Sequence, residues 1–197
     1  MIAEPLVRAR HLKSLLTAVD ALACAPAVRA HVGAAVLGAT EGASGIDWLP
    51  LEHDLAFTGA IYQVLPAAEA DAFFRAHTSA SFEGPLLRTM VDTAVRLFGL
   101  DPGSWARWVP KGWSMIFRGT GEWSVGAIRP GEARLGLAAL PDEAIAHAHW
   151  LRSVARSLDA LCDLARCTGG MELAAVDLAA RRADFVLRWA AGARRAG

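Results

Sequence analysis

The chain has 197 residues and no formal net charge at pH 7, and apolar residues make up 54% of it. This length suits one domain, and the apolar share allows a sizeable buried core. A chain without net charge has no global basic field, so nucleic acid and anionic membranes are not expected as partners.

Cysteine content and the N-terminal sequence indicate the cellular compartment. An odd number of cysteines without regular spacing argues against a disulfide framework, so Cys24, Cys162 and Cys167 are expected to be buried or half-buried thiols. The N-terminus carries an early acid and lacks a signal-peptide pattern. The longest weakly charged stretch, residues 30–40, is too short to span a bilayer. We therefore expect a cytoplasmic protein, and the strong preference for arginine over lysine suggests a bacterial GC-rich genome.

The first half of the sequence predicts helices, because apolar residues recur at helical spacing. A loop is expected at 41–45 and a turn at 79–85. A short turn of helix should follow around Trp105 and Trp108, after the Asp101-Pro102 start signal. The longer predicted helices cover residues 7–23, 27–38, 51–65, 67–76 and 86–98.

The second half predicts two hairpins around one long helix. Alternating, β-branched and aromatic residues favour strands, and Arg129-Pro130-Gly131-Glu132 suits a type II turn between the strands of the first hairpin. One helix is expected from Pro141 to about Cys167, with His147 on its apolar stripe. The predicted strands cover residues 115–117, 123–128, 133–140, 171–177 and 184–189.

These elements predict an α+β fold, with N-terminal helices followed by an antiparallel sheet built as hairpin, long helix and hairpin. No repeat or low-complexity linker divides the chain. A single domain over residues 1–197 is expected, with a helical N-terminal extension over 1–45 and a core over 46–190.

Known catalytic patterns are missing from the sequence. It contains no HExxH, CxxC, GxSxG, SxxK or phosphate-binding glycine loop. We therefore predict a protein that is not an enzyme and that has no metal and no cofactor. One sequence leaves open a site of scattered residues, for example Glu122 and His147 in one cleft.

His147 is the most interesting of the six histidines. His147 and His149 are two positions apart on a predicted helix, so they cannot chelate one metal ion. Two interpretations remain for His147: a core or rim histidine bonded to a neighbour, and a ligand, for example to haem iron.

Tryptophan is unusually frequent, and four of the seven indoles fall between residues 105 and 123. Basic residues alternate with them. Such a cationic–aromatic cluster can bind an anion, a nucleotide base or the surface of a partner. Alternatively, the indoles build the core and bond their N–H groups to backbone. The candidate ligand- or partner-binding residues are Trp105, Trp108, Trp113, Trp123, Arg107, Arg118 and His147.

Four segments carry a resemblance to known proteins. They are WLPLEHDLAF at 48–57, LFGLDPGSWARWVPKGW at 97–113, the predicted helix 143–167 ending in CTGG, and ADFVLRW at 183–189. The chain resembles a myxobacterial paralogous family of unknown function. More remotely, it is similar to the superfamily of haem-NO-binding domains, 4-vinyl-reductase-type domains and Bet3-type trafficking subunits.

This resemblance implies a small antiparallel sheet with a long helix packed on it, in proteins that dimerise and act as sensors or scaffolds. The haem-binding branch carries a YxSxR motif in its sheet region. The only tyrosine of this chain, Tyr62, lies far from that region, so haem binding is not expected.

Together these observations predict a non-enzymatic regulatory or scaffold domain that binds a partner protein, as a homodimer. A small-molecule sensor that holds an apolar ligand between helices and sheet is the alternative. An enzyme whose site is invisible in sequence is the second alternative.

Overall fold

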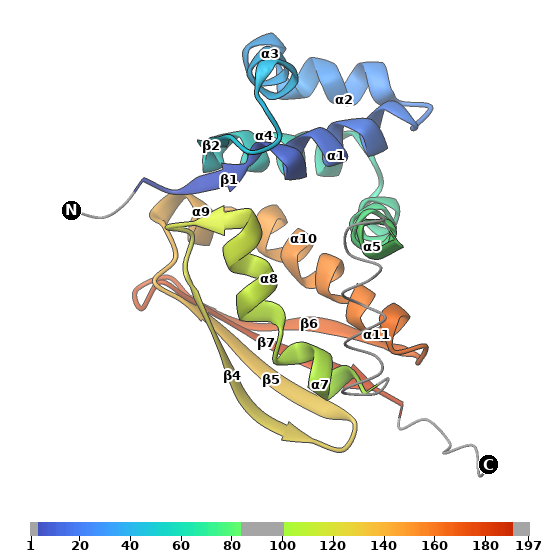
Figure 1. Ribbon diagram of the computed structural model, residues 1–197, viewed down its shortest axis with the longest axis vertical. Helices are drawn as coiled ribbons and strands as arrows, with labels where there is room; N and C mark the ends of the chain where they lie inside the picture. The colour runs from blue at the N-terminus through green and yellow to red at the C-terminus, as the bar shows by residue number, and fades with distance from the viewer. Residues whose placement is uncertain (1–3, 84–100, 191–197) are drawn as a thin grey trace.

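The computed structural model describes residues 4–83 and 101–190 (Figure 1). No helix in these two segments is long and apolar enough to cross a membrane. In chain order the elements are β1 (Leu6–Arg8), α1 (Ala9–Asp20), α2 (Ala25–Val32), α3 (Ala34–Gly42), β2 (Trp48–Pro50), α4 (Leu51–Val64), α5 (Ala67–Glu83), α7 (Pro102–Ala106), α8 (Val109–Ile116), β3 (Phe117–Arg118), β4 (Glu122–Arg129), β5 (Glu132–Ala138), α9 (Asp142–Ala146), α10 (Ala148–Leu158), α11 (Ala160–Leu164), β6 (Gly169–Asp177) and β7 (Arg182–Trp189).

The fold has a helical layer and a sheet layer. Helices α1 to α4 lie at one end of the molecule and the four-stranded sheet β4-β5-β7-β6 at the other, with α10 between them (Figure 1). Helices α7, α8, α10 and α11 pack on this sheet. A small antiparallel sheet, β2-β1-β3, joins the N-terminal segment to the end of α8. The predicted α+β class is therefore confirmed.

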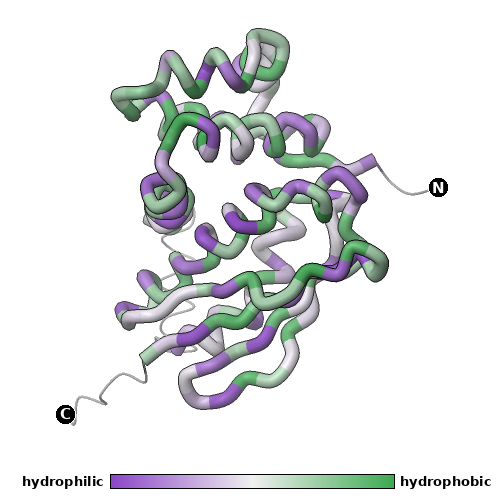
Figure 2. The backbone as a smooth tube through the Cα atoms, turned by 180° about the vertical axis from the view of Figure 1, so that it is seen from behind, coloured by the Kyte–Doolittle hydropathy of each residue, from purple (hydrophilic) through white to green (hydrophobic). Residues whose placement is uncertain are grey.

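Both predicted hairpins are present. All pairs in the larger sheet are antiparallel, and Gly131 at the first turn has φ +81°, which suits position i+2 of a type II turn. Hydrophobic and hydrophilic residues alternate along the strands (Figure 2). Leu135, Leu137, Phe185 and Leu187 are consequently buried on the face that the helices cover.

The expected long helix is divided into α9, α10 and α11. His147 leaves the helical conformation, with φ −92° and ψ 86°, and caps α10 instead. Its Nδ1 accepts a hydrogen bond from the backbone N–H of Trp150 at 3.1 Å. The apolar stripe of Leu151, Val154 and Leu161 is buried as predicted, but His147 stands at the break rather than within a helix.

Other boundaries differ from the predictions for local reasons. The expected helix 27–38 is two helices, because Gly33 has φ +86° and separates α2 from α3. Helix α5 continues to Glu83, through the first part of the expected turn at 79–85. Residues 115 and 116, expected in a strand, end α8. The expected helix 86–98 lies outside the described residues.

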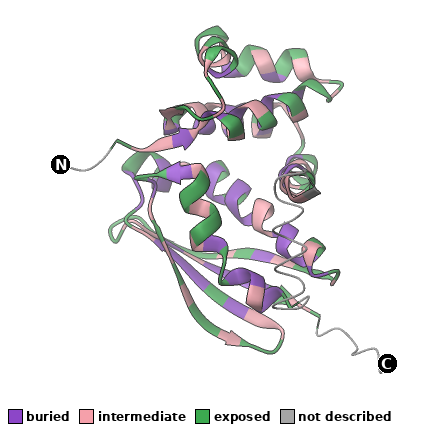
Figure 3. Ribbon diagram, viewed as in Figure 1, coloured by how far each residue is buried: buried purple, intermediate pink, exposed green. Residues whose placement is uncertain are grey.

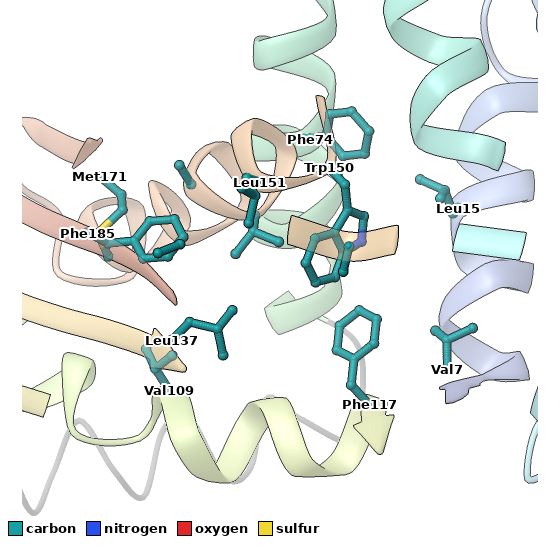
Figure 4. Close-up of a cluster of buried hydrophobic side chains, with 14 of the residues drawn as sticks. Val7, Leu15, Phe74, Val109, Phe117, Leu137, Trp150, Leu151, Met171 and Phe185 are labelled. Carbon is teal, nitrogen blue, oxygen red and sulfur yellow. The ribbon is translucent and has the colours of Figure 1, made fainter. Parts of the chain in front are cut away.

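The core is one buried cluster that contains residues from both layers. In Figure 4, Val7 and Leu15 of the helical layer lie on one side of Trp150, and Met171 and Phe185 of the sheet layer lie on the other. Trp150 is 1% exposed and is among the largest fully buried side chains. Its ring therefore stands at the seam between the layers.

A charged hydrogen bond crosses this seam. The indole Nε1–H of Trp150 donates to Oδ2 of Asp54 on α4 at 2.7 Å, and Asp54 is 4% exposed. The other carboxylate oxygen lies 3.2 Å from Nε2 of His11 on α1. Because a buried carboxylate needs partners, this contact ties α10 to the helical layer in one geometry.

We expect Trp150→Phe to destabilise the protein more than Trp123→Phe. Each change removes an indole, but only Trp150 loses a hydrogen bond to a carboxylate, while Nε1 of Trp123 is buried without a partner. The difference in the free energy of unfolding should be about 1.5–3 kcal/mol, the usual value for a bond to a charged group. Urea denaturation measures it, and equal losses would contradict the assigned role of the Asp54 bond.

Candidate functional site

The structure does not bring the seven predicted site residues together. Trp105, Trp113 and Trp123 turn into the protein, while Arg107, Trp108 and Arg118 are exposed. His147 lies in a separate groove beside α4. The predicted cluster therefore separates into interior rings and surface groups.

The interior indoles belong to an aromatic cluster between α8, α10 and the sheet. Trp113 lies 4.2 Å from Phe117, 5.7 Å from Trp123 and 5.8 Å from Trp150, measured between ring centroids. Trp123 also contacts Phe185 at 5.0 Å. These indoles build the core, as the second interpretation expected.

The expected backbone partners of these indoles are missing. Within the described residues, the Nε1 groups of Trp105, Trp113 and Trp123 are buried without a hydrogen bond. An unpaired buried N–H costs about 1–3 kcal/mol. Burial of the large ring offsets this cost, so packing accounts for these three indoles and hydrogen bonding does not.

The exposed residues form a stripe along α7 and α8, which we call the α8 face: Arg107, Trp108, Lys111 and Met115. Arg107 and Trp108 both have helical backbone angles, so the spacing of four residues places these side chains on one side. Trp108 is 42% and Met115 is 47% exposed. Figure 3 shows this side of α8 on the outside of the molecule.

Charge pairing sets this region apart. Within the described segments, Arg107 and Lys111 of the α8 face and the neighbouring Arg8 and Arg118 make no ion pair with a carboxylate. Elsewhere arginine is usually paired, and the paired residues are Arg29, Arg75, Arg134, Arg152, Arg156, Arg181, Arg182 and Arg188. Four basic side chains near α8 are thus without an ion pair in the described segments, although the chain as a whole is neutral.

Trp48 supplies the cationic–aromatic contact that was expected further along the chain. The guanidinium carbons of Arg8 and Arg118 lie 3.8 Å and 3.9 Å from the centroid of its ring. The three residues stand on β1, β2 and β3, and Arg8 is paired directly with Trp48. Sequence reasoning missed Arg8 and Trp48, because strands this short carry no periodic signal of their own.

His147 lines an open groove of about 360 Å³ between α2, α4 and the start of α10. Its Nδ1 accepts the bond from Trp150, so the neutral ring carries its proton on Nε2. Burial, and then the neighbouring His149, lowers the pKa of His147. The groove has an apolar floor, and polar groups surround it; its lining residues are His31, Glu52, Leu55, Ala56, Gly59, Ala60, Gln63 and His147.

The seam contains a serine–histidine contact that resembles a nucleophile and its base. Oγ of Ser14 lies 3.0 Å from Nε2 of His77, which is 8% exposed. Burial first, and then the charge of His11, lowers the pKa of His77 to about 4, while Asp54 acts in the opposite direction. A base this weak removes a hydroxyl proton poorly near pH 7, so the pair does not support hydrolysis.

Thiol and metal chemistry receive little support. Cys162 is buried, Cys24 and Cys167 are half-buried, and all three are free, as predicted. Burial raises the pKa of Cys162 to about 12 and also raises that of Cys167, which disfavours the reactive thiolate. No group of three or more potential metal ligands occurs among residues 4–83 and 101–190.

The fold is similar to that of solved H-NOX domains. An Fe(II) unliganded H-NOX protein from K. algicida matches with a TM-score of 0.62 at 8% identity, over 94% of this chain and 97% of that one. A point mutant of it gives a TM-score of 0.65 at 7% identity, over 93% and 96%. A third chain, from a study of heme distortion in the H-NOX family, gives 0.60 at 6% identity, over 96% and 98%.

No family model and no curated protein matches the sequence. The remote likeness to haem-NO-binding domains is thus supported at the level of the fold. The nearer resemblance to a myxobacterial family gains no support.

We expect acid to destabilise the protein through His77. Its folded-state pKa of about 4 is below the ordinary 6.5, so unfolding takes up a proton. The stability that neutral His77 contributes is complete above pH 6.5 and is lost as the pH falls towards 4, by about 3 kcal/mol. His77→Gln should remove this part of the pH dependence in urea denaturation, whereas exposed His31→Gln should not. An unchanged pH profile in His77→Gln would refute the assignment.

Proposed function

We propose that this protein is a non-enzymatic regulatory domain of H-NOX-like fold that works without haem and binds a partner protein through the α8 face. The observation that carries the proposal is the exposed row of an indole, a methionine and unpaired cations on α7 and α8. Tryptophan, methionine and arginine are the residues enriched at protein interfaces.

One solved neighbour is an Fe(II) H-NOX protein and another comes from a study of heme distortion, so the fit of haem to this chain requires a test. A haem would need a wide apolar cavity and an uncommitted axial ligand. The space between α8, α10 and the sheet is instead occupied by the rings of Trp113, Phe117, Trp123 and Trp150, whose measured centroid separations are 4.2–6.1 Å. Such packing leaves no room for a porphyrin there.

Three of the six histidines are engaged in other contacts. His11 is held by Asp54 and His77 by Ser14, and the Nδ1 of His147 is used in capping α10. Tyr62, the only candidate for the tyrosine of the haem motif, donates its hydroxyl to Asp71 at 2.8 Å and stands on α4. These contacts, together with the packed aromatic rings, support a protein that works without haem.

The α8 face supports protein binding better than nucleic-acid binding. Its two apolar side chains, Trp108 and Met115, alternate with only two cations, Arg107 and Lys111. A nucleic-acid surface usually needs a longer basic stripe to release counterions. Homodimerisation stays a prediction, and a second copy of the chain is one candidate partner.

The groove at His147 favours a second function, the sensing of a small molecule. Its volume falls in the range of ligand sites, and the Nε2–H of His147 can donate to a ligand above an apolar floor. This place differs from the expected one between helices and sheet. His147 caps α10. A ligand in the groove would therefore contact the helix whose Trp150 donates a hydrogen bond to Asp54.

We expect the protein to carry no Soret band when it is produced in cells supplied with a haem precursor, because the aromatic cluster fills the interior. Absorbance near 400 nm relative to 280 nm measures this on the purified protein, in the range typical of haem. A stoichiometric Soret band that is lost in His147→Ala would contradict the proposal.

We expect a photo-crosslinking amino acid at Met115 to give adducts with another protein in cells that natively contain this chain. The same group at Arg134, on the outer face of the sheet, is the matched control. Adding Lys111→Glu should reduce the Met115 adduct several-fold if the face is electrostatically complementary to its partner.

Adducts of equal yield at both positions would refute a specific role of the α8 face. Light scattering of the purified chain distinguishes the two kinds of partner. A dimer that dissociates in Met115→Glu identifies a second copy as the partner, and a monomer identifies a different protein.

A further inference from the structure

We propose that Arg8, Trp48 and Arg118 form a binding site for a phosphate monoester or inorganic phosphate. This site, which we call the Trp48 site, lies on the small sheet and does not depend on the partner proposed for the α8 face. Its contacts, its charge and its accessibility each support an oxyanion ligand.

The geometry brings two cations together. Both guanidinium carbons lie within 4 Å of one ring centroid, at 3.8 Å for Arg8 and 3.9 Å for Arg118. They are therefore no farther apart than the sum of these two distances. One tetrahedral oxyanion is large enough to accept hydrogen bonds from two guanidinium groups so placed.

The side chain of Arg8 is tethered before any ligand binds, and the backbone of Arg118 is fixed by strand pairing. Arg8 donates from Nη1 to the backbone oxygen of Ile46 at 2.6 Å. The backbone of Arg118 is paired with that of Leu6 across β1 and β3. A guanidinium that is stacked and tethered loses less conformational freedom when it binds an anion.

No carboxylate within the described residues neutralises this pair, whereas arginines elsewhere in the structure usually have one. Arg118 is exposed, and Trp48 and Arg8 are half-buried, so solvent reaches the site. Within the described residues only Nη1 of Arg8 donates a hydrogen bond, to Ile46, so the other N–H groups of the two arginines remain for a ligand. An anion from solution can therefore provide the negative charge that pairs with Arg8 and Arg118.

The charge of the pair favours phosphate over a single carboxylate. A phosphate monoester carries a charge of about −1.5 to −2 near neutral pH, which matches two arginines. Both guanidinium groups already contact the indole, and we expect the ligand to bind their N–H groups rather than the ring. The phosphoryl group itself, rather than a nucleotide base, is thus what this site recognises.

NMR of the arginine Nε–Hε groups tests the proposal on the full chain. Inorganic phosphate, a phosphoserine peptide and succinate are titrated separately against chloride at constant ionic strength. We expect the signals of Arg8 and Arg118 to shift and saturate with phosphate, while that of Arg134, which is paired with Glu132, stays in place. The relative affinities for inorganic phosphate and the peptide distinguish a free ligand from a phosphorylated partner.

Variants make the test specific. Arg118→Gln should weaken phosphate binding at least about tenfold, because one charge-assisted contact is lost, and Arg118→Lys should recover only part of it. Arg129→Gln, another exposed arginine without an ion pair in the described structure, should bind as the unaltered protein does.

Three results would overturn the proposal. Linear shifts that Arg134 shares indicate charge screening only. Succinate binding as tightly as phosphate contradicts the ligand class. Unchanged phosphate affinity in Arg118→Gln contradicts the assignment of the residues.

Discussion

The buried carboxylate of Asp54 is the interaction on which the arrangement of the two layers depends. It accepts a hydrogen bond from the indole N–H of Trp150 and lies beside His11. This one residue of α4 therefore connects its helix to α1 and α10. Apolar packing alone tolerates small sliding between layers, because it is not directional. A buried charge with two required partners is satisfied in one register only. The hydrophobic cluster supplies most of the stabilisation, and this contact selects the geometry.

The contact at Asp54 also bears on the positions of the His147 groove and of the α8 face. The break at His147 turns the start of α10 so that Trp150 reaches Asp54, and the same break leaves the His147 ring beside α4 at the groove. On the other side, α8 ends in β3, and β3 pairs with β1. The α8 face and the Trp48 site are therefore neighbours, carried by one continuous segment from Arg107 to Arg118.

Similarity of fold does not by itself determine function. The chain aligns over nearly its whole length with H-NOX structures at 6–8% identity. Such likeness describes the path of the backbone. The interior is built by side chains, and here aromatic rings fill the space between helices and sheet. Two chains can therefore share a backbone path while different side chains fill the space inside it.

Local chemistry in the sequence determined the helices of the first half, the two hairpins and the turn at Gly131, because periodicity and turn residues act between near neighbours. It also named Trp108, Arg107 and Arg118 as binding candidates, together with Trp105, Trp113, Trp123 and His147, and left open that the indoles build the core. The tertiary structure alone decided the three-stranded sheet, the break at His147 and the meeting of Arg8 with Trp48 and Arg118. These features join residues far apart in the chain through strand pairing, capping and charge, and no short-range pattern encodes such contacts.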